Sequence, residues 1–176
     1  PFVGKVDATK IAASGHSKGG KLAFYAAALD PRIDLVIGWD PVNAGGPPCF
    51  VDPAGCHRLP VAPNCAVMDS GITHYIRAET LVIGAPPDAS WNPEPSHNAE
   101  HFYRGAPSPA AYVKLDAGHV DWVSGLSAKP DVVRITKSVQ LALLLTRFRG
   151  VSGLEADLPG GASLAGEALV ADVRMK

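Results

Sequence analysis

The sequence Lys10-Ile-Ala-Ala-Ser-Gly-His-Ser-Lys-Gly-Gly20 decides the fold of this chain. Its first part, residues 11–14, is short and apolar, as is typical of a buried strand. Residues 21–29 are rich in strong helix formers and end before Asp30 and Pro31, which predicts a helix with a defined stop. A tight turn therefore has to join a strand to a helix within a few residues.

The turn carries the pattern G-x-S-x-G, with Ser17 at its centre, which is the signature of a nucleophile elbow. We expect a strained backbone at Ser17 and an exposed hydroxyl at the carboxyl end of the strand. Because strand and helix approach closely, we expect no room for side chains at Gly15 and Gly19, with Gly20 adding conformational freedom. The helix dipole and the backbone N–H of Lys18 would stabilise an oxyanion beside the serine.

The composition is that of one ordinary globular domain, with 176 residues, 47% of them hydrophobic and 19% charged. A net charge of −1 argues against a nucleic-acid partner or a polybasic membrane contact. No apolar run in the sequence, residues 141–145 included, is long enough to span a bilayer, and nothing in the sequence indicates an oligomeric state. The chain begins without Met and almost directly at the elbow strand, so we expect an N-terminal half, with any targeting signal, to precede it.

A second apolar strand at 33–39 follows the helix, so the two strands form a strand–helix–strand unit and are expected to be parallel. Ser17 and Asp40 would then lie at the same carboxyl edge of the sheet, where ligands bind in open α/β folds. Further strands are expected at 79–84 and 111–115, a helix at 131–149 and a weak helix at 162–173. The predicted fold class is α/β, a mostly parallel sheet with flanking helices within residues 1–149, followed by a C-terminal tail at 150–176.

Residues 43–75 differ from the rest of the chain because proline and glycine break any regular element there. Irregular segments of this length are often lids or binding loops, and we expect one over the carboxyl edge of the sheet; a covering loop without substrate contact is the alternative. The three cysteines, Cys49, Cys56 and Cys65, allow at most one internal disulfide and lack zinc-ribbon spacing.

A serine hydroxyl needs a base within hydrogen-bond reach and an acid that orients the base. Among the histidines, His119 is the best candidate for the base because it directly follows the last predicted strand, whereas the side chain of His16 should point away from that of Ser17. Two carboxylates compete for the role of the acid. Asp40 emerges directly from its strand and Asp88 follows the next one, so the residues alone favour neither.

A second pattern, H-x-x-E-H at His97, Glu100 and His101, matches an inverted zinc-protease signature. No clear third ligand follows it, so we expect no metal there and interpret both histidines as loop or pocket-wall residues. Several aromatic residues flank the predicted catalytic loops and would line an apolar pocket or join the core: Trp39, Trp91, Phe102, Tyr103 and Trp122.

With these residues in view, the chain resembles the chlorophyllase-like branch of the α/β hydrolases, which is related to dienelactone-hydrolase-like and platelet-activating-factor acetylhydrolase-like esterases. The resemblance covers roughly residues 7–145. Its elbow reads GHSKGGK where the branch has GHSRGGK, so Lys18 replaces the usual arginine. The other matching segments are 35–42 with its DPV sequence, 80–84, 98–103 and 116–121.

The resemblance implies that the acid is Asp40 rather than Asp88, with Ser17 as nucleophile and His119 as base. It further implies hydrolysis of an apolar ester such as chlorophyll to chlorophyllide and phytol, without metal or organic cofactor, in a plastid. A general esterase or lipase of the related types, and a non-catalytic hydrolase-like binding protein, are the alternatives. The second oxyanion donor of such folds comes from an earlier segment, so we expect this chain alone to be nearly inactive and, through an open elbow strand, prone to aggregate.

Overall fold

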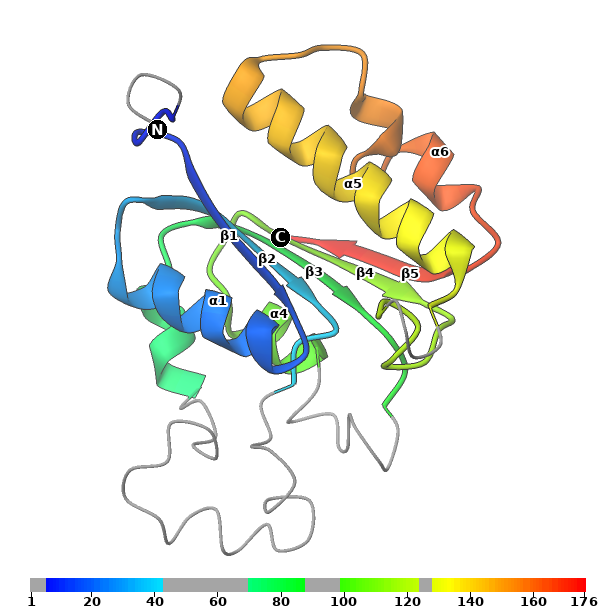
Figure 1. Ribbon diagram of the computed structural model, residues 1–176, viewed down its shortest axis with the longest axis horizontal. Coiled ribbons are helices and arrows are strands. Elements are labelled where there is room, and N and C mark those ends of the chain that lie inside the picture. Colours follow the sequence, from blue (N-terminus) through cyan, green and yellow to red (C-terminus); the bar gives the residue numbers. More distant parts are fainter. Residues whose placement is uncertain (1–5, 43–69, 88–98, 124–127) are drawn as a thin grey trace, which may run out of the picture.

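The computed structural model describes residues 6–42, 70–87, 99–123 and 128–176, and within them the chain forms a five-stranded sheet in the order β1-β2-β3-β4-β5 (Figure 1). The first four strands are parallel and β5 runs antiparallel to β4. Their bounds are Ile11–His16 for β1, Ile33–Trp39 for β2, Glu79–Gly84 for β3, Ala110–Leu115 for β4 and Val170–Met175 for β5.

Helices cover both faces of this sheet (Figure 1). One face carries α1 (Lys18–Leu29), the short 3₁₀ helix η1 (Ser70–Tyr75) and α4 (Ala99–Gly105). The opposite face carries α5 (Pro130–Arg149), followed by the 3₁₀ turn η2 (Glu155–Asp157) and α6 (Ala162–Ala165). None of the helices in the described ranges is both long and apolar enough to cross a membrane.

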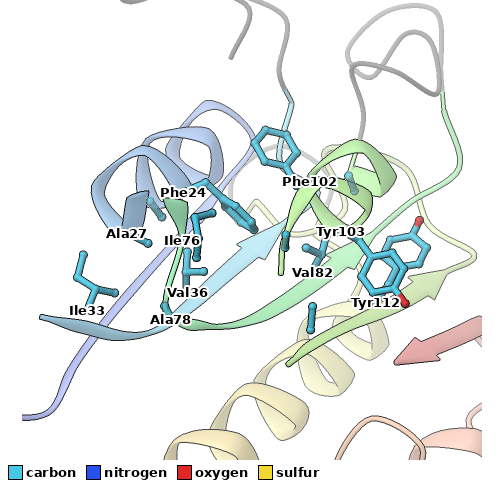
Figure 2. Packing of buried hydrophobic residues seen from close by; sticks show 14 residues of the cluster. Phe24, Ala27, Ile33, Val36, Ile76, Ala78, Val82, Phe102, Tyr103 and Tyr112 are labelled. Carbon is cyan, nitrogen blue, oxygen red and sulfur yellow. The ribbon is translucent and has the colours of Figure 1, made fainter. Parts of the chain in front are cut away.

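The two faces have separate hydrophobic cores, because alternate residues of each strand point to opposite sides. On the α1 face, Val36 and Val82 of the sheet lie beneath Phe24 and Phe102, whose rings meet edge-on with centroids 4.9 Å apart (Figure 2). On the α5 face, the neighbouring strand residues Leu35, Ile37, Leu81 and Ile83 pack against α5, which contributes Ile135 and Val139. Strands buried on both faces explain the apolar runs within 35–39 and 81–84, and both predicted strands, 33–39 and 79–84, are confirmed.

The C-terminal segment departs from the prediction. A helix was expected over 162–173, but α6 ends at Ala165, and Val170–Met175 forms β5, which pairs with β4 along its whole length. The prediction of a helix beyond Ala165 is wrong because Gly166 ends the helix, after which Val170 and Val173 pack on the α5-side core. Residues 150–176 thus complete the sheet.

The excursion predicted at 43–75 is only partly described. Its last six residues form η1, whose Thr73 is buried beside α4, so the irregular segment ends earlier than expected. Residues 43–69, with Cys49, Cys56 and Cys65, lie outside the described residues.

Candidate active site at the carboxyl edge of the sheet

Ser17 occupies the single position between the end of β1 and the start of α1. Its φ of 55° and ψ of −124° are unfavourable for a residue with a side chain, so the expected strain at the elbow is confirmed. The turn is held by a hydrogen bond from the Ser17 backbone N–H to the carbonyl of Trp39, 2.9 Å away at the end of β2. The serine is therefore tied to the neighbouring strand.

Of the three glycines in the elbow, Gly15 has the predicted role, whereas Gly19 and Gly20 differ from the prediction. A Cβ at Gly15 would overlap the backbone of Gly19, which confirms that Gly15 has no room for a side chain. A Cβ at Gly20 would lie 2.8 Å from the Cβ of Pro41, whereas one at Gly19 would meet none of the described atoms within 4 Å. The expectation for Gly19 is wrong because α1 already begins at Lys18, and its rotation turns Gly19 outward and Gly20 toward the sheet.

Asp40 follows β2 and is completely buried, with a φ of 40°. One carboxylate oxygen, Oδ1, accepts a hydrogen bond from the backbone N–H of Ala85 at 2.9 Å. The other, Oδ2, lies 2.6 Å from Nδ1 of His119. The backbone N–H of Asp40 donates to the carbonyl of Ile83. A buried carboxylate requires such partners, and together they hold it in one orientation.

His119 lies on the loop after β4 and is 4% exposed. Its Nε2 lies 2.9 Å from Oγ of Ser17, and its Nδ1 contacts Asp40. With the proton on Nδ1, the ring donates to the carboxylate and can accept the serine proton on Nε2. The structure thus brings Ser17, His119 and Asp40 into one hydrogen-bonded chain, while the rival acid Asp88 lies outside the described residues.

The turn that carries His119 is braced by Asp121, which is 5% exposed. The carboxylate of Asp121 accepts from the backbone N–H of Gly118 at 2.7 Å and pairs with Nζ of Lys129 at 2.8 Å. The hydrogen bond to Asp121 raises the pKa of Lys129. The same carboxylate therefore fixes the turn and connects it to the beginning of α5.

His16, the residue before the serine, is a feature that sequence reasoning missed. Its Nε2 lies 2.8 Å from the backbone carbonyl of His119, and the two rings lie with their centroids 4.8 Å apart. The centroid of its ring also lies 6.0 Å from that of Trp122. The one sequence feature that could have indicated this contact is the position of His16 inside the elbow. A side chain that points away from Ser17 at that position reaches the loop after β4.

The H-x-x-E-H pattern has a different role in the structure. Glu100 on α4 accepts hydrogen bonds from Arg104 at 2.8 Å and Arg174 at 2.6 Å, and these arginines lower its pKa against the effect of burial. The ring of His101 packs edge-on against Phe102. His97 lies outside the described residues, and the described part of the chain holds no group of three or more potential metal ligands.

A cavity of about 650 Å³ lies between the end of β2 and the start of α5. Its walls include Trp39, which directly precedes Asp40, and Trp122, near His119. The indole N–H groups are satisfied by Gln140 and Thr136, which leaves the rings to line the wall. Of the other aromatic residues, Phe102 and Tyr103 belong to the core on the α1 face, and Trp91 lies outside the described residues.

A mostly parallel sheet between two helical layers, with a strained serine at a strand–helix turn, defines a partial α/β-hydrolase fold. No family model matches the sequence. The chain is 32% identical over 172 residues to Chlorophyllase-2 of Arabidopsis thaliana, which covers 86% of this chain and 51% of that protein. It is also 32% identical over 121 residues to Chlorophyllase-1 of the same plant, covering 61% of this chain and 34% of that protein.

These similarities support placing the chain in the chlorophyllase-like branch of the α/β hydrolases, a family of hydrolases of the esterase kind. It spans about half the length, or less, of these curated relatives.

Proposed function

We propose that this chain carries the reactive centre of a carboxylic-ester hydrolase that works through an acyl-enzyme on Ser17. The observation that carries the proposal is the hydrogen-bonded chain from Ser17 through His119 to the buried Asp40. A serine, an imidazole and a carboxylate in this order supply a nucleophile, a base and a group that stabilises the charged base.

In the proposed reaction, Oγ of Ser17 attacks the ester carbonyl while Nε2 of His119 takes the serine proton. The oxyanion is stabilised by the backbone N–H of Lys18 at the start of α1. As the carbon–oxygen bond breaks, His119 returns the proton to the leaving alcohol and an acyl-serine remains. Water, deprotonated by His119, then releases the acid and restores the serine. Asp40 holds the imidazole throughout and stabilises its charged form.

We propose an apolar ester as the substrate, and chlorophyll, cut to chlorophyllide and phytol, as its first candidate. The names of the relatives support this choice. Trp39 and Trp122 could contact apolar parts of a substrate, although the cavity that they line also carries the polar side chains of Arg134, Thr136 and Lys137.

A fluorophosphonate probe, which labels activated serines, tests the proposed chemistry. The full-length protein should be labelled, and the same protein with Ser17→Ala should not. Labelling of the wild type together with turnover of chlorophyll supports the chlorophyllase assignment, whereas turnover of short p-nitrophenyl esters alone indicates a general esterase. A folded protein without any labelling would indicate a non-catalytic binding protein.

The identity of the acid is tested by a matched pair of substitutions. Asp40→Asn keeps the shape of the side chain but favours the wrong tautomer of His119, so kcat should fall by about 10⁴-fold. Asp88→Asn should leave kcat within a few-fold of the wild type. The reverse result would assign the role to Asp88.

A further inference from the structure

His16 connects the two segments on which the proposed chemistry depends. It is adjacent to Ser17 in sequence, yet its ring crosses to the loop after β4 and contacts the backbone of His119, 103 positions away. The rings of His16 and His119 are tilted by 32° with centroids 4.8 Å apart, and the ring centroids of His16 and Trp122 are 6.0 Å apart. The ring therefore lies beside two residues of the loop after β4, His119 and Trp122.

The atoms in contact define what His16 does. A backbone carbonyl can only accept, so Nε2 of His16, 2.8 Å from the carbonyl oxygen of His119, carries a proton and donates it. This nitrogen cannot then accept a proton from Ser17, which excludes it as a competing base. The interaction is made to the main chain of His119 and leaves both ring nitrogens of His119 to Ser17 and Asp40.

The loop after β4 is fixed by hydrogen bonds to its main chain at and next to His119. Before it, the backbone N–H of Gly118 is fixed by Asp121. The carbonyl of His119 itself is fixed by His16. His16 and Ser17 are consecutive residues of one strained turn. A shift of the elbow therefore moves Ser17 directly and moves His119 through its hydrogen bond with His16, so the two side chains stay together.

We propose that His16 is a positioning residue that ties the loop of the base His119 to the turn of the nucleophile Ser17, so that the distance from Nε2 of His119 to Oγ of Ser17 is maintained. The proposal deepens the proposed hydrolase function and rests on it. A displacement of about 1 Å between reacting groups costs on the order of 10²-fold in rate, which sets the size of the expected effect.

Two substitutions of similar size isolate the hydrogen bond. His16→Gln retains an N–H donor at the end of the side chain, and His16→Met has nearly the same length without a donor; both lose the ring contacts equally. In the full-length protein we expect His16→Met to lower kcat on the order of 10- to 100-fold with KM changed less than about twofold, and His16→Gln to recover most of the loss. The control is His74→Gln, at an exposed position of η1, which should match the wild type.

A second measurement does not depend on turnover. The proton between Nδ1 of His119 and Asp40 should give a far-downfield proton NMR signal that persists in His16→Gln and is lost or exchange-broadened in His16→Met. Equal kcat and equal signals in the two variants would overturn the positioning role. If Ser17→Ala shows that the protein is no serine hydrolase, the NMR comparison still decides whether His16 holds the loop.

Discussion

At Ser17 and Asp40 the backbone has φ values of 55° and 40°, and these are the two non-glycine residues with positive φ in the described part of the chain. Each such conformation costs about 1–3 kcal/mol and persists only where its surroundings impose it. Here the backbone N–H of each residue donates to the end of a neighbouring strand, at Trp39 and Ile83. The proposed nucleophile and acid are thus positioned by backbone hydrogen bonds to the sheet.

The elbow glycines allow a direct test of this packing. Gly15→Ala places a methyl group against the backbone of Gly19 and should destabilise the protein by about 1–3 kcal/mol or more. Gly19→Ala meets none of the described atoms and should be neutral or stabilise α1 by up to about 1 kcal/mol. Urea unfolding of the two variants measures both effects. A larger loss for Gly19→Ala would contradict the assignment of the tight contact to Gly15.

The environment of His16 predicts how stability depends on pH. Burial, reinforced by the charge of His119 when protonated, lowers the pKa of His16 below its usual 6.5, against the opposing hydrogen bond to His119 and the charge of Asp40. Below about pH 6.5 the unfolded chain therefore binds a proton that the folded chain resists, and the free energy of unfolding falls as pH falls. His16→Gln should show a smaller fall between pH 7 and pH 5 in urea unfolding. Identical pH dependence in both proteins would contradict this reasoning.

At the scale of elements, each member of the hydrogen-bonded chain follows a different parallel strand: Ser17 follows β1, Asp40 follows β2 and His119 follows β4. Parallel strands bring their carboxyl ends to one edge, so residues far apart in sequence converge there. β5 runs in the opposite direction, and it pairs with the edge of β4 that faces away from β3. Because β4 carries the loop of His119, β5 supports the site indirectly.

Two substitutions to aspartate in β5, one at a packed position and one at an exposed position, test whether this strand is part of the core. Val173 packs against the α5-side core opposite Val113, so Val173→Asp should destabilise the protein by about 1–3 kcal/mol. Ala171 is exposed in the same strand, so Ala171→Asp should change stability by less than about 0.5 kcal/mol. Thermal unfolding compares them. Equal effects would mean that residues 170–175 behave as a tail.

At the scale of the whole molecule, the two edges of the sheet differ in character. β5 carries the charged residues Asp172 and Arg174, which discourage pairing with another strand. β1 pairs with β2 alone among the described residues, and its sequence IAASGH contains no acidic residue, lysine or arginine. Ala12 and Ser14 of β1 are exposed on the face opposite α1. The edge at β1 is thus the more suitable one for accepting a further strand.

We expect the 176-residue chain to self-associate through β1 as its concentration rises. Ala12→Lys, which places a charge on the exposed side of that strand, should reduce association in sedimentation velocity. Ser152→Lys adds the same charge at an exposed loop position and should not. Equal behaviour of the two variants would show that association does not depend on β1.

The sequence by itself determined the features that depend on neighbouring residues. Continuous apolar runs located β2 and β3, and the pattern G-x-S-x-G located the turn and the strain at Ser17, because local sterics allow few other conformations. The residues alone left Asp40 and Asp88 open, and a resemblance was needed to prefer Asp40.

Only the tertiary structure decided the features that depend on distant contacts. The rotation of α1 over Pro41 decided that Gly20 rather than Gly19 is the tight position. Pairing with β4 decided that residues 170–175 form a strand. The approach of the loop after β4 decided that His16 contacts the carbonyl of His119. In each case the deciding neighbour lies far away in the sequence, so no local pattern of side chains records the interaction.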